Sequence, residues 1–112
     1  MRAETLKGHL DGLLLAALEA GPLHGYGVIE ALRVGSKGMF DLPTGTVYPA
    51  LHRLERAGLV ASTWSTGPGR RRRSYQLTAA GITALAEQRD GWQTFSRSVT
   101  TLLKGRAWPA PA

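Results

Sequence analysis

Apolar side chains recur at helical spacing in the first third of the chain. Over residues 10–20 they fall at steps of three and four, which predicts a helix with one buried stripe that ends at Gly21-Pro22. Residues 24–27, His-Gly-Tyr-Gly, have the composition of a turn. The apolar positions within residues 28–32 then predict a second, short helix that stops near Gly35.

A third helix is expected from about Thr46 to Ala57, with Gly58 as a left-handed cap after its end. Pro49 lacks an amide hydrogen and is tolerated where that hydrogen would have no intrahelical partner. This requirement favours Thr46, or Gly45 just before it, as the N-cap. The stripe expected to face inward consists of Val47, Leu51 and Leu54.

The second half of the chain changes from strand-like to helical spacing. Residues 59–65 and 74–77 predict two strands, and the turn-rich residues 66–69 followed by four arginines predict a hairpin loop between them. Thr78 fits the N-cap of a last long helix that reaches about Lys104.

This order of elements predicts a mainly α protein with a small β-hairpin (α+β), a winged helix-turn-helix with a long C-terminal dimerisation helix. The expected division is a winged-helix DNA-binding domain at 1–77, the dimerisation helix at 78–104 and a flexible Pro/Ala tail at 105–112. In such a fold the third helix enters the DNA major groove and the hairpin tip reaches the adjacent backbone or minor groove.

The positive charge of the chain is concentrated in its second half. The net charge is +6; residues 1–58 hold six basic and six acidic residues, whereas residues 59–112 hold eight basic and two acidic ones. Four of those eight are Arg70–Arg73. A basic patch on a neutral body is typical of a protein that binds a polyanion, and the alternative is a solvated charge run that keeps the protein soluble.

The residue inventory argues against catalysis and against a bound metal or other cofactor. There is no cysteine, and His9, His24 and His52 are scattered over three elements without a close His pair, which favours structural or surface histidines. The alternative is a metal-sensing site in which folding and dimerisation gather His9 with carboxylates such as Glu4 or Asp11. No nucleophile–base set stands out, so no enzyme activity is expected. The longest apolar run, residues 13–18, is too short to span a bilayer and the N-terminus lacks a secretory pattern, so a cytoplasmic location without membrane association is expected.

Several ordered motifs resemble the PadR family of transcriptional regulators over roughly residues 6–103. They are His24-Gly25-Tyr26, the run Thr44-Gly45-Thr46-Val47-Tyr48-Pro49-Ala50-Leu51 with Arg53-Leu54-Glu55 and Gly58-Leu59 after it, and Tyr75-Gln76-Leu77-Thr78 with Gly81. The C-terminal region is a single helix, which is short by the standard of the family and is similar to that of the small subfamily. The resemblance implies a homodimeric repressor that binds an inverted-repeat operator in double-stranded DNA and is released by a small-molecule or metal-ion effector.

The residues expected to contact DNA lie in the third helix and the hairpin. Thr46, Tyr48, His52 and Arg53 belong to the helix, where the resemblance associates Tyr48 with DNA contact; the alternative for Tyr48 is packing against the hairpin or the second helix. The arginines of the hairpin, Arg70, Arg71, Arg72 and Arg73, suit phosphates or a narrow minor groove. Strand alternation prevents all four from pointing the same way, so Arg73 and Arg71 are the ones that could lie on the sheet and pair with acids instead.

The last helix carries an apolar stripe too long to be buried by one small domain, which indicates pairing with a second subunit. The expected dimer-interface residues are Leu85, Arg89, Trp92, Phe95, Val99 and Leu102. By its position after Thr78, Trp92 is similar to a drug-stacking tryptophan of one family member, and the same alignment places Gly8, Gly12 and Ser96 along the pore of the dimer. The alternative for Trp92 is packing in the dimer core without a ligand.

Two other functions compete with the repressor. An architectural or RNA-binding basic protein would use Arg70–Arg73 without preferring one duplex sequence. A ligand-binding or protein-interaction module on a winged-helix scaffold would tolerate loss of these arginines.

Overall fold

The computed structural model describes residues 6, 8–65, 69 and 71–105. Three helices precede a two-stranded hairpin and a long final helix, which confirms the predicted α+β winged-helix arrangement. The elements are α1 (Leu10–Ala17), β1 (Leu23–His24), α2 (Gly25–Gly35), α3 (Thr44–Arg56), β2 (Val60–Trp64), β3 (Arg73–Leu77) and α4 (Ala79–Leu103).

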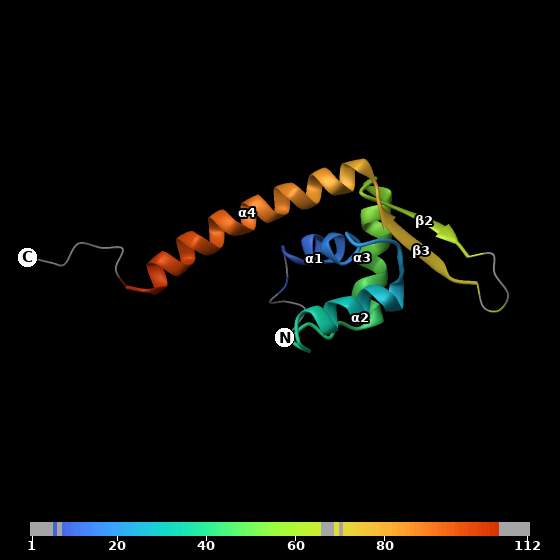
Figure 1. The fold of residues 1–112 in the computed structure, drawn as a ribbon, viewed down its shortest axis with the longest axis horizontal. Coiled ribbons are helices and arrows are strands. Elements are labelled where there is room, and N and C mark those ends of the chain that lie inside the picture. Colours follow the sequence, from blue (N-terminus) through green and yellow to red (C-terminus); the bar gives the residue numbers. More distant parts are fainter. Residues whose placement is uncertain (1–5, 7, 66–68, 70, 106–112) are drawn as a thin grey trace, which may run out of the picture.

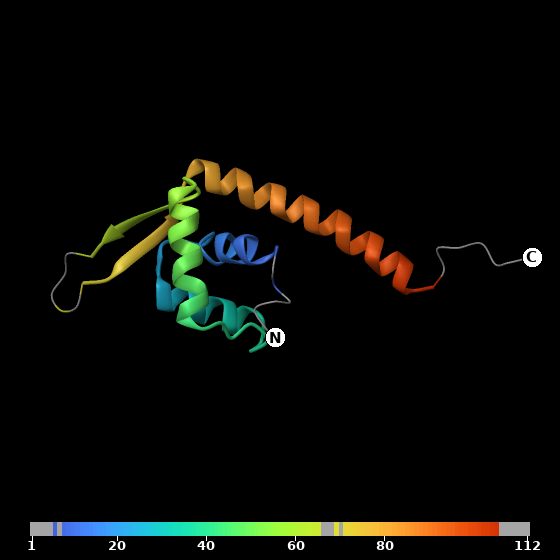
Figure 2. The same ribbon diagram turned by 180° about the vertical axis from the view of Figure 1, so that it is seen from behind.

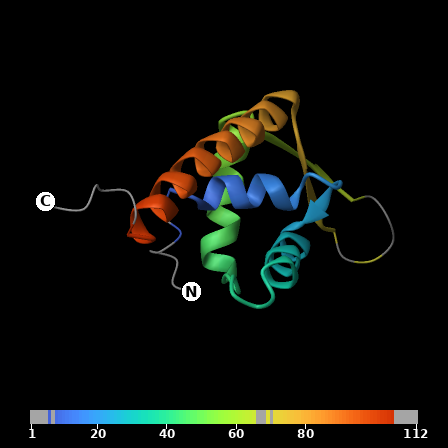
Figure 3. The same cartoon turned by 60° about the vertical axis from the view of Figure 1, so that its left-hand side comes forward.

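The three short helices form a body from which the hairpin and α4 extend in opposite directions (Figure 1). Seen from behind, α3 crosses between α1 and the hairpin (Figure 2). In a view turned by 60°, α1 crosses α3 and lies below α4 (Figure 3). The hairpin β2–β3 is called the wing below.

The core joins all these elements. The stripe predicted for α3 is confirmed, since Val47 and Leu51 are fully buried and Leu54 is 1% exposed. Tyr75 of the wing and Leu85 of α4 are buried with them. Because Leu85 shares this core, the first turns of α4 pack as part of the body, and the division at residue 78 stays a prediction.

The sheet has one strand more than the hairpin predicted from the sequence. Its order is β1-β3-β2, all antiparallel, and Leu23 and His24 pair with Tyr75 and Ser74. The prediction of a turn at residues 24–27 was therefore wrong. His24 is in a strand and α2 begins at Gly25, because pairing with β3 satisfies this extended backbone before the helix starts.

The start of α3 also differs from the expectation. The helix begins at Thr44 with Pro43 as its N-cap, and the amides of Thr46 and Val47 both donate to the Pro43 carbonyl, at 3.0 and 3.1 Å. Pro49 thus lies inside the helix. It leaves the Gly45 carbonyl without its usual donor, but Gly45 is exposed, so water can hydrogen-bond that carbonyl at little cost.

The helix α1 ends at Ala17, earlier than the expected residue 20. The amides of Leu18 and Glu19 bond to the carbonyls of Leu15 and Ala16, three residues back, at 3.1 and 3.2 Å. These tighter bonds close the last turn ahead of the glycine and proline that were expected to end it.

Two caps predicted from the sequence are confirmed and fix the wing and α4. Gly58 has a φ of +79°, and the amides of Gly58 and Leu59 donate to Glu55 and Leu54 in a Schellman arrangement. The Thr78 hydroxyl accepts from the Gly81 amide at 3.0 Å and donates to the Gly58 carbonyl at 2.6 Å. The start of α4 is therefore hydrogen-bonded to the end of α3.

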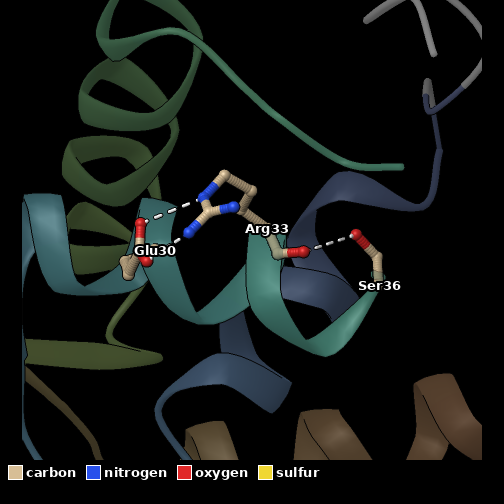
Figure 4. Close-up of polar contacts among 3 residues, drawn as sticks. All are labelled: Glu30, Arg33 and Ser36. Carbon is tan, nitrogen blue, oxygen red and sulfur yellow. Dashed lines mark hydrogen bonds and ion pairs between the residues drawn. The ribbon is translucent and has the colours of Figure 1, made fainter. Parts of the chain in front are cut away.

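The connection between α2 and α3 is held by polar contacts at the end of α2 (Figure 4). The Arg33 guanidinium donates to both Glu30 carboxylate oxygens, and this hydrogen bonding lowers the pKa of Glu30. The Ser36 hydroxyl donates to the Arg33 carbonyl at 3.3 Å and accepts from the Phe40 amide at 2.8 Å. Phe40 then packs against the core.

The second half of α4 leaves its apolar side chains open. Trp92, Phe95, Leu102 and Leu103 are 52%, 57%, 60% and 82% exposed. Within the described part of the chain, no helix combines the length and apolar character needed to cross a membrane.

Candidate nucleic-acid interface

A groove of about 580 Å³ runs between α3 and the wing. Aromatic and basic side chains from α2, α3 and both wing strands line it. They are Tyr26, Tyr48, His52, Trp64, Arg71, Arg72, Arg73 and Tyr75.

Tyr48 joins α3 to α2 at one side of this groove. Its ring lies directly against the α-carbon of Gly25, where a methyl group would overlap the ring. The Tyr48 and Tyr26 rings meet edge to face with centroids 6.1 Å apart. This geometry supports the packing role for Tyr48, and since its ring also lines the groove, DNA contact stays a prediction.

The other three predicted α3 residues separate into two groups. Exposed His52 lines the groove one turn after Tyr48, and Thr46 is half-buried in the first turns of the helix. Arg53 instead reaches α1, where its guanidinium holds the Asp11 carboxylate at 2.7 and 2.8 Å. A DNA contact by Arg53 stays a prediction that would compete with this ion pair.

Arg73 binds α3 from within the sheet. Its guanidinium donates to the Glu55 carboxylate at 3.0 Å and to the Ser62 hydroxyl at 2.8 Å. Ser62 in turn donates to the second Glu55 oxygen at 2.5 Å. Arg73 therefore lies on the sheet and pairs with an acid of α3, one of the two alternatives that strand alternation left open for it.

Arg71 lies on the exposed face of the wing. Its guanidinium carbon is 4.8 Å from the centre of the Trp64 ring, a cation–π distance. The Arg72 carbonyl accepts from the Ser65 amide at 2.8 Å, and the Arg72 amide donates to the Ser65 hydroxyl at 3.1 Å. Arg72 itself is exposed. Arg70 lies outside the described residues.

Tyr75 closes the base of the groove, and its burial makes folding sensitive to alkaline pH. Burial raises the pKa of the Tyr75 phenol above that of the unfolded chain. Its contribution to stability is then complete below about pH 10, where the unfolded phenol titrates, and is lost as the pH rises through the higher folded pKa.

We therefore expect the urea midpoint to fall above about pH 10, and Tyr75→Phe to flatten that fall. Denaturation at a series of pH values measures this, with exposed Tyr26→Phe as the matched control. An equally steep fall in the Tyr75→Phe protein would contradict the assignment.

A second hollow, of about 540 Å³, lies between α1 and α4. Gly12 and Trp92, two of the predicted effector residues, line it together with His9, whose ring meets Trp92 edge to face at 5.2 Å. Gly8 lines a smaller adjoining hollow with the same Trp92 and His9. Ser96 lines neither of the two; its hydroxyl bonds to the Gln93 carbonyl.

The residues predicted for a dimer interface have different surroundings within one chain. Leu85 is 3% exposed and belongs to the core. Arg89 holds the Glu19 carboxylate at 2.7 Å through both nitrogens, which lowers the pKa of Glu19. The remaining four residues project from the second half of α4 and are exposed or half-buried: Trp92, Phe95, Val99 and Leu102.

The histidines lie on separate elements. His9 contacts Trp92, His52 lies in the groove, and His24 lies in β1 with its buried Nδ1 lacking a hydrogen-bond partner. Among the described residues, no three acidic, histidine or cysteine side chains gather closely enough to hold a metal ion.

Five side chains of the interface were not identified as site residues from the sequence. Tyr26, Trp64 and Tyr75 line the groove, and Glu55 and Ser62 bind Arg73. The 70% exposed Tyr26 and 50% exposed Trp64 could have been noticed as large aromatic residues next to predicted turns. No local pattern indicates Glu55, because its partner is 18 residues away.

Comparison with known proteins shows similarity to transcriptional regulators in both sequence and structure. The sequence profile of the family described as transcriptional regulator PadR-like matches residues 14–87. A transcriptional regulator of Mycobacterium tuberculosis is 39% identical over 77 residues, which is 69% of each chain. The solved structure of a PadR family transcriptional regulator from Eggerthella lenta is 32% identical, with a TM-score of 0.79 over 89% of this chain and 86% of that chain. A PadR-like transcriptional regulator from Bacillus cereus is 28% identical, with a TM-score of 0.79 over 93% and 100%.

Proposed function

Because the chain belongs to the PadR-like family of transcriptional regulators, we propose that it is a repressor that binds operator DNA as a homodimer. The operator is an inverted repeat, and a small-molecule or metal-ion effector releases the protein from it. In this proposal α3 reads base edges in the major groove while the wing contacts the neighbouring backbone or minor groove.

The observation that carries this proposal is the groove between α3 and the wing. It collects Tyr48 and His52 from the helix with the cations of Arg71 and Arg72 from the wing. Hydroxyl and imidazole groups can hydrogen-bond base edges, whereas guanidinium groups suit phosphates. Both kinds of contact are needed by a protein that selects one duplex sequence among many.

The exposed half of α4 supports the dimer. Three of its apolar side chains, Trp92, Phe95 and Leu102, are each more than half exposed in the isolated chain. A contiguous apolar face of this kind is typical of an interface with another protein. In a two-fold dimer the two α3 helices would enter successive major grooves about one helical turn apart.

The hollow between α1 and α4 supports effector binding near that interface. Its lining is mostly apolar and includes Trp92. The helix α1 connects this hollow to α3 through the Asp11–Arg53 ion pair. A ligand bound beside α1 would shift the population between dimers that match the operator spacing and dimers that do not.

Fluorescence anisotropy on a duplex from the gene's own upstream region, across a salt series, tests the function. We expect the upstream duplex to bind at least about 10³-fold more tightly than a scrambled duplex, and the affinity to fall steeply with salt. Equal affinity for both duplexes would favour an architectural protein. No binding at low salt would favour a ligand or protein-interaction module.

A further inference from the structure

Two arginine side chains of the wing lie near Trp64, and they have different partners. Arg73 is opposite Trp64 in the strand register and lies 5.7 Å from its ring centre, with Glu55 and Ser62 holding its guanidinium. Arg71, two residues earlier, lies 4.8 Å from the centre of the same ring. The residues on this face of the wing therefore form one cluster around Trp64.

The charge of Arg73 is already balanced within the protein. Its partner carboxylate is only 26% exposed and also accepts from Ser62, so both carboxylate oxygens of Glu55 have protein donors. Moving Arg73 to a phosphate would leave Glu55 partly buried without its cation, which is unfavourable. This arginine is suited to joining the wing to α3.

Arg71 has a different environment. An aromatic face holds a guanidinium in place without using its N–H groups, which remain free for other acceptors. Trp64 is half exposed, so the stacked guanidinium stays at the surface of the groove. Holding a flexible side chain in its binding position reduces the entropy lost on binding.

We infer that Trp64 is a positioning residue for DNA binding: it presents Arg71 to a backbone phosphate, while Arg73 clamps the wing to α3 and contacts no phosphate. This inference rests on the proposed operator binding, and it assigns different roles to the two arginines beside Trp64: Arg71 contacts DNA, whereas Arg73 fixes the angle of the wing.

The two arginines are distinguished by salt dependence and stability. A plot of log affinity against log salt has a negative slope, and the magnitude of this slope decreases by about 0.9 for each phosphate contact that is lost. A dimer loses the contact twice, so the expected decrease is about 1.8. Arg71→Gln should decrease the magnitude of the slope by that amount and leave the urea midpoint unchanged. Arg73→Gln should lower the midpoint and the affinity but leave the slope unchanged.

Arg33→Gln is the charge-matched control, because it removes the same charge from an arginine that pairs with Glu30 outside the groove (Figure 4). It should change neither the slope nor the affinity for the operator.

The role of Trp64 is tested by a double-mutant cycle on the upstream duplex. Trp64→Leu should weaken binding about five- to tenfold with the slope retained, and Trp64→Phe should restore most of the loss because it keeps an aromatic face. In the Arg71→Gln background, Trp64→Leu should have an effect of less than about twofold, since its partner is gone.

Equal losses from Trp64→Leu in both backgrounds, or a slope lowered by Arg73→Gln as much as by Arg71→Gln, would overturn the inference while leaving operator binding intact. If the unaltered protein does not prefer its upstream duplex to the scrambled one, the proposed function fails first and the inference fails with it.

Discussion

Replacing Gly81 with alanine should destabilise the protein by about 3 kcal/mol or more, a large effect for a single methyl group. The added carbon would overlap the Leu59 carbonyl oxygen, which is a backbone atom and already accepts the Thr78 amide. Either α4 moves away from the end of α3 or the Thr78 cap is broken. Urea denaturation at fixed protein concentration measures the change.

Gly91→Ala in the same helix is the matched control. A methyl group there meets nothing within 4 Å. Because alanine is the better helix former, this variant should be stabilised by up to about 1 kcal/mol. Similar stability changes in the two variants would show that the contact at Gly81 is not what holds α4 in place.

Placing a charge on the exposed apolar face of α4 should convert the proposed dimer into a monomer. In Phe95→Glu each subunit would lose the burial of a large apolar side chain and would bring a carboxylate into the interface. Two such losses amount to about 4 kcal/mol per dimer, roughly a thousandfold in the dissociation constant. Light scattering should then report a mass near the single-chain 12.0 kDa instead of twice that value.

The same variant should bind the operator far more weakly, because a monomer engages one half-site. Thr94→Glu, which adds the same charge at an exposed position next to Phe95, should keep both the mass and the affinity. A dimeric Phe95→Glu protein would exclude this face of α4 as the interface, and circular dichroism checks that its helix content is retained.

Local signals predicted much of this fold because the residues concerned act on their immediate neighbours. Gly58 and Thr78 each cap a helix by hydrogen bonds to residues within a few positions, and both were identified from the sequence. The buried stripe of α3 followed from its spacing. β1 was missed because two residues have no periodicity; its strand character comes from pairing with Ser74 and Tyr75, about fifty residues later.

The candidate site was predictable in residue type more than in arrangement. The arginines of the wing mark a basic surface, but the sequence does not tell which of them meets Glu55 and which meets Trp64. Arg53 illustrates the same limit of local pattern, because its partner Asp11 is 42 residues away on another helix. Partners so far apart come together through packing, and no spacing rule encodes that.

The two-residue strand β1 bears on how the proposed repressor would adapt to different operators. It joins the corner between α1 and α2 to β3, and Arg73 joins β3 to α3, so strand pairing and an ion pair link the wing to the helices. These links oppose a change in the angle between α3 and the wing. In the proposed dimer, an operator with altered half-site spacing would then be accommodated by rotation between subunits or by bending of the duplex, and its deformability would become part of what the protein selects.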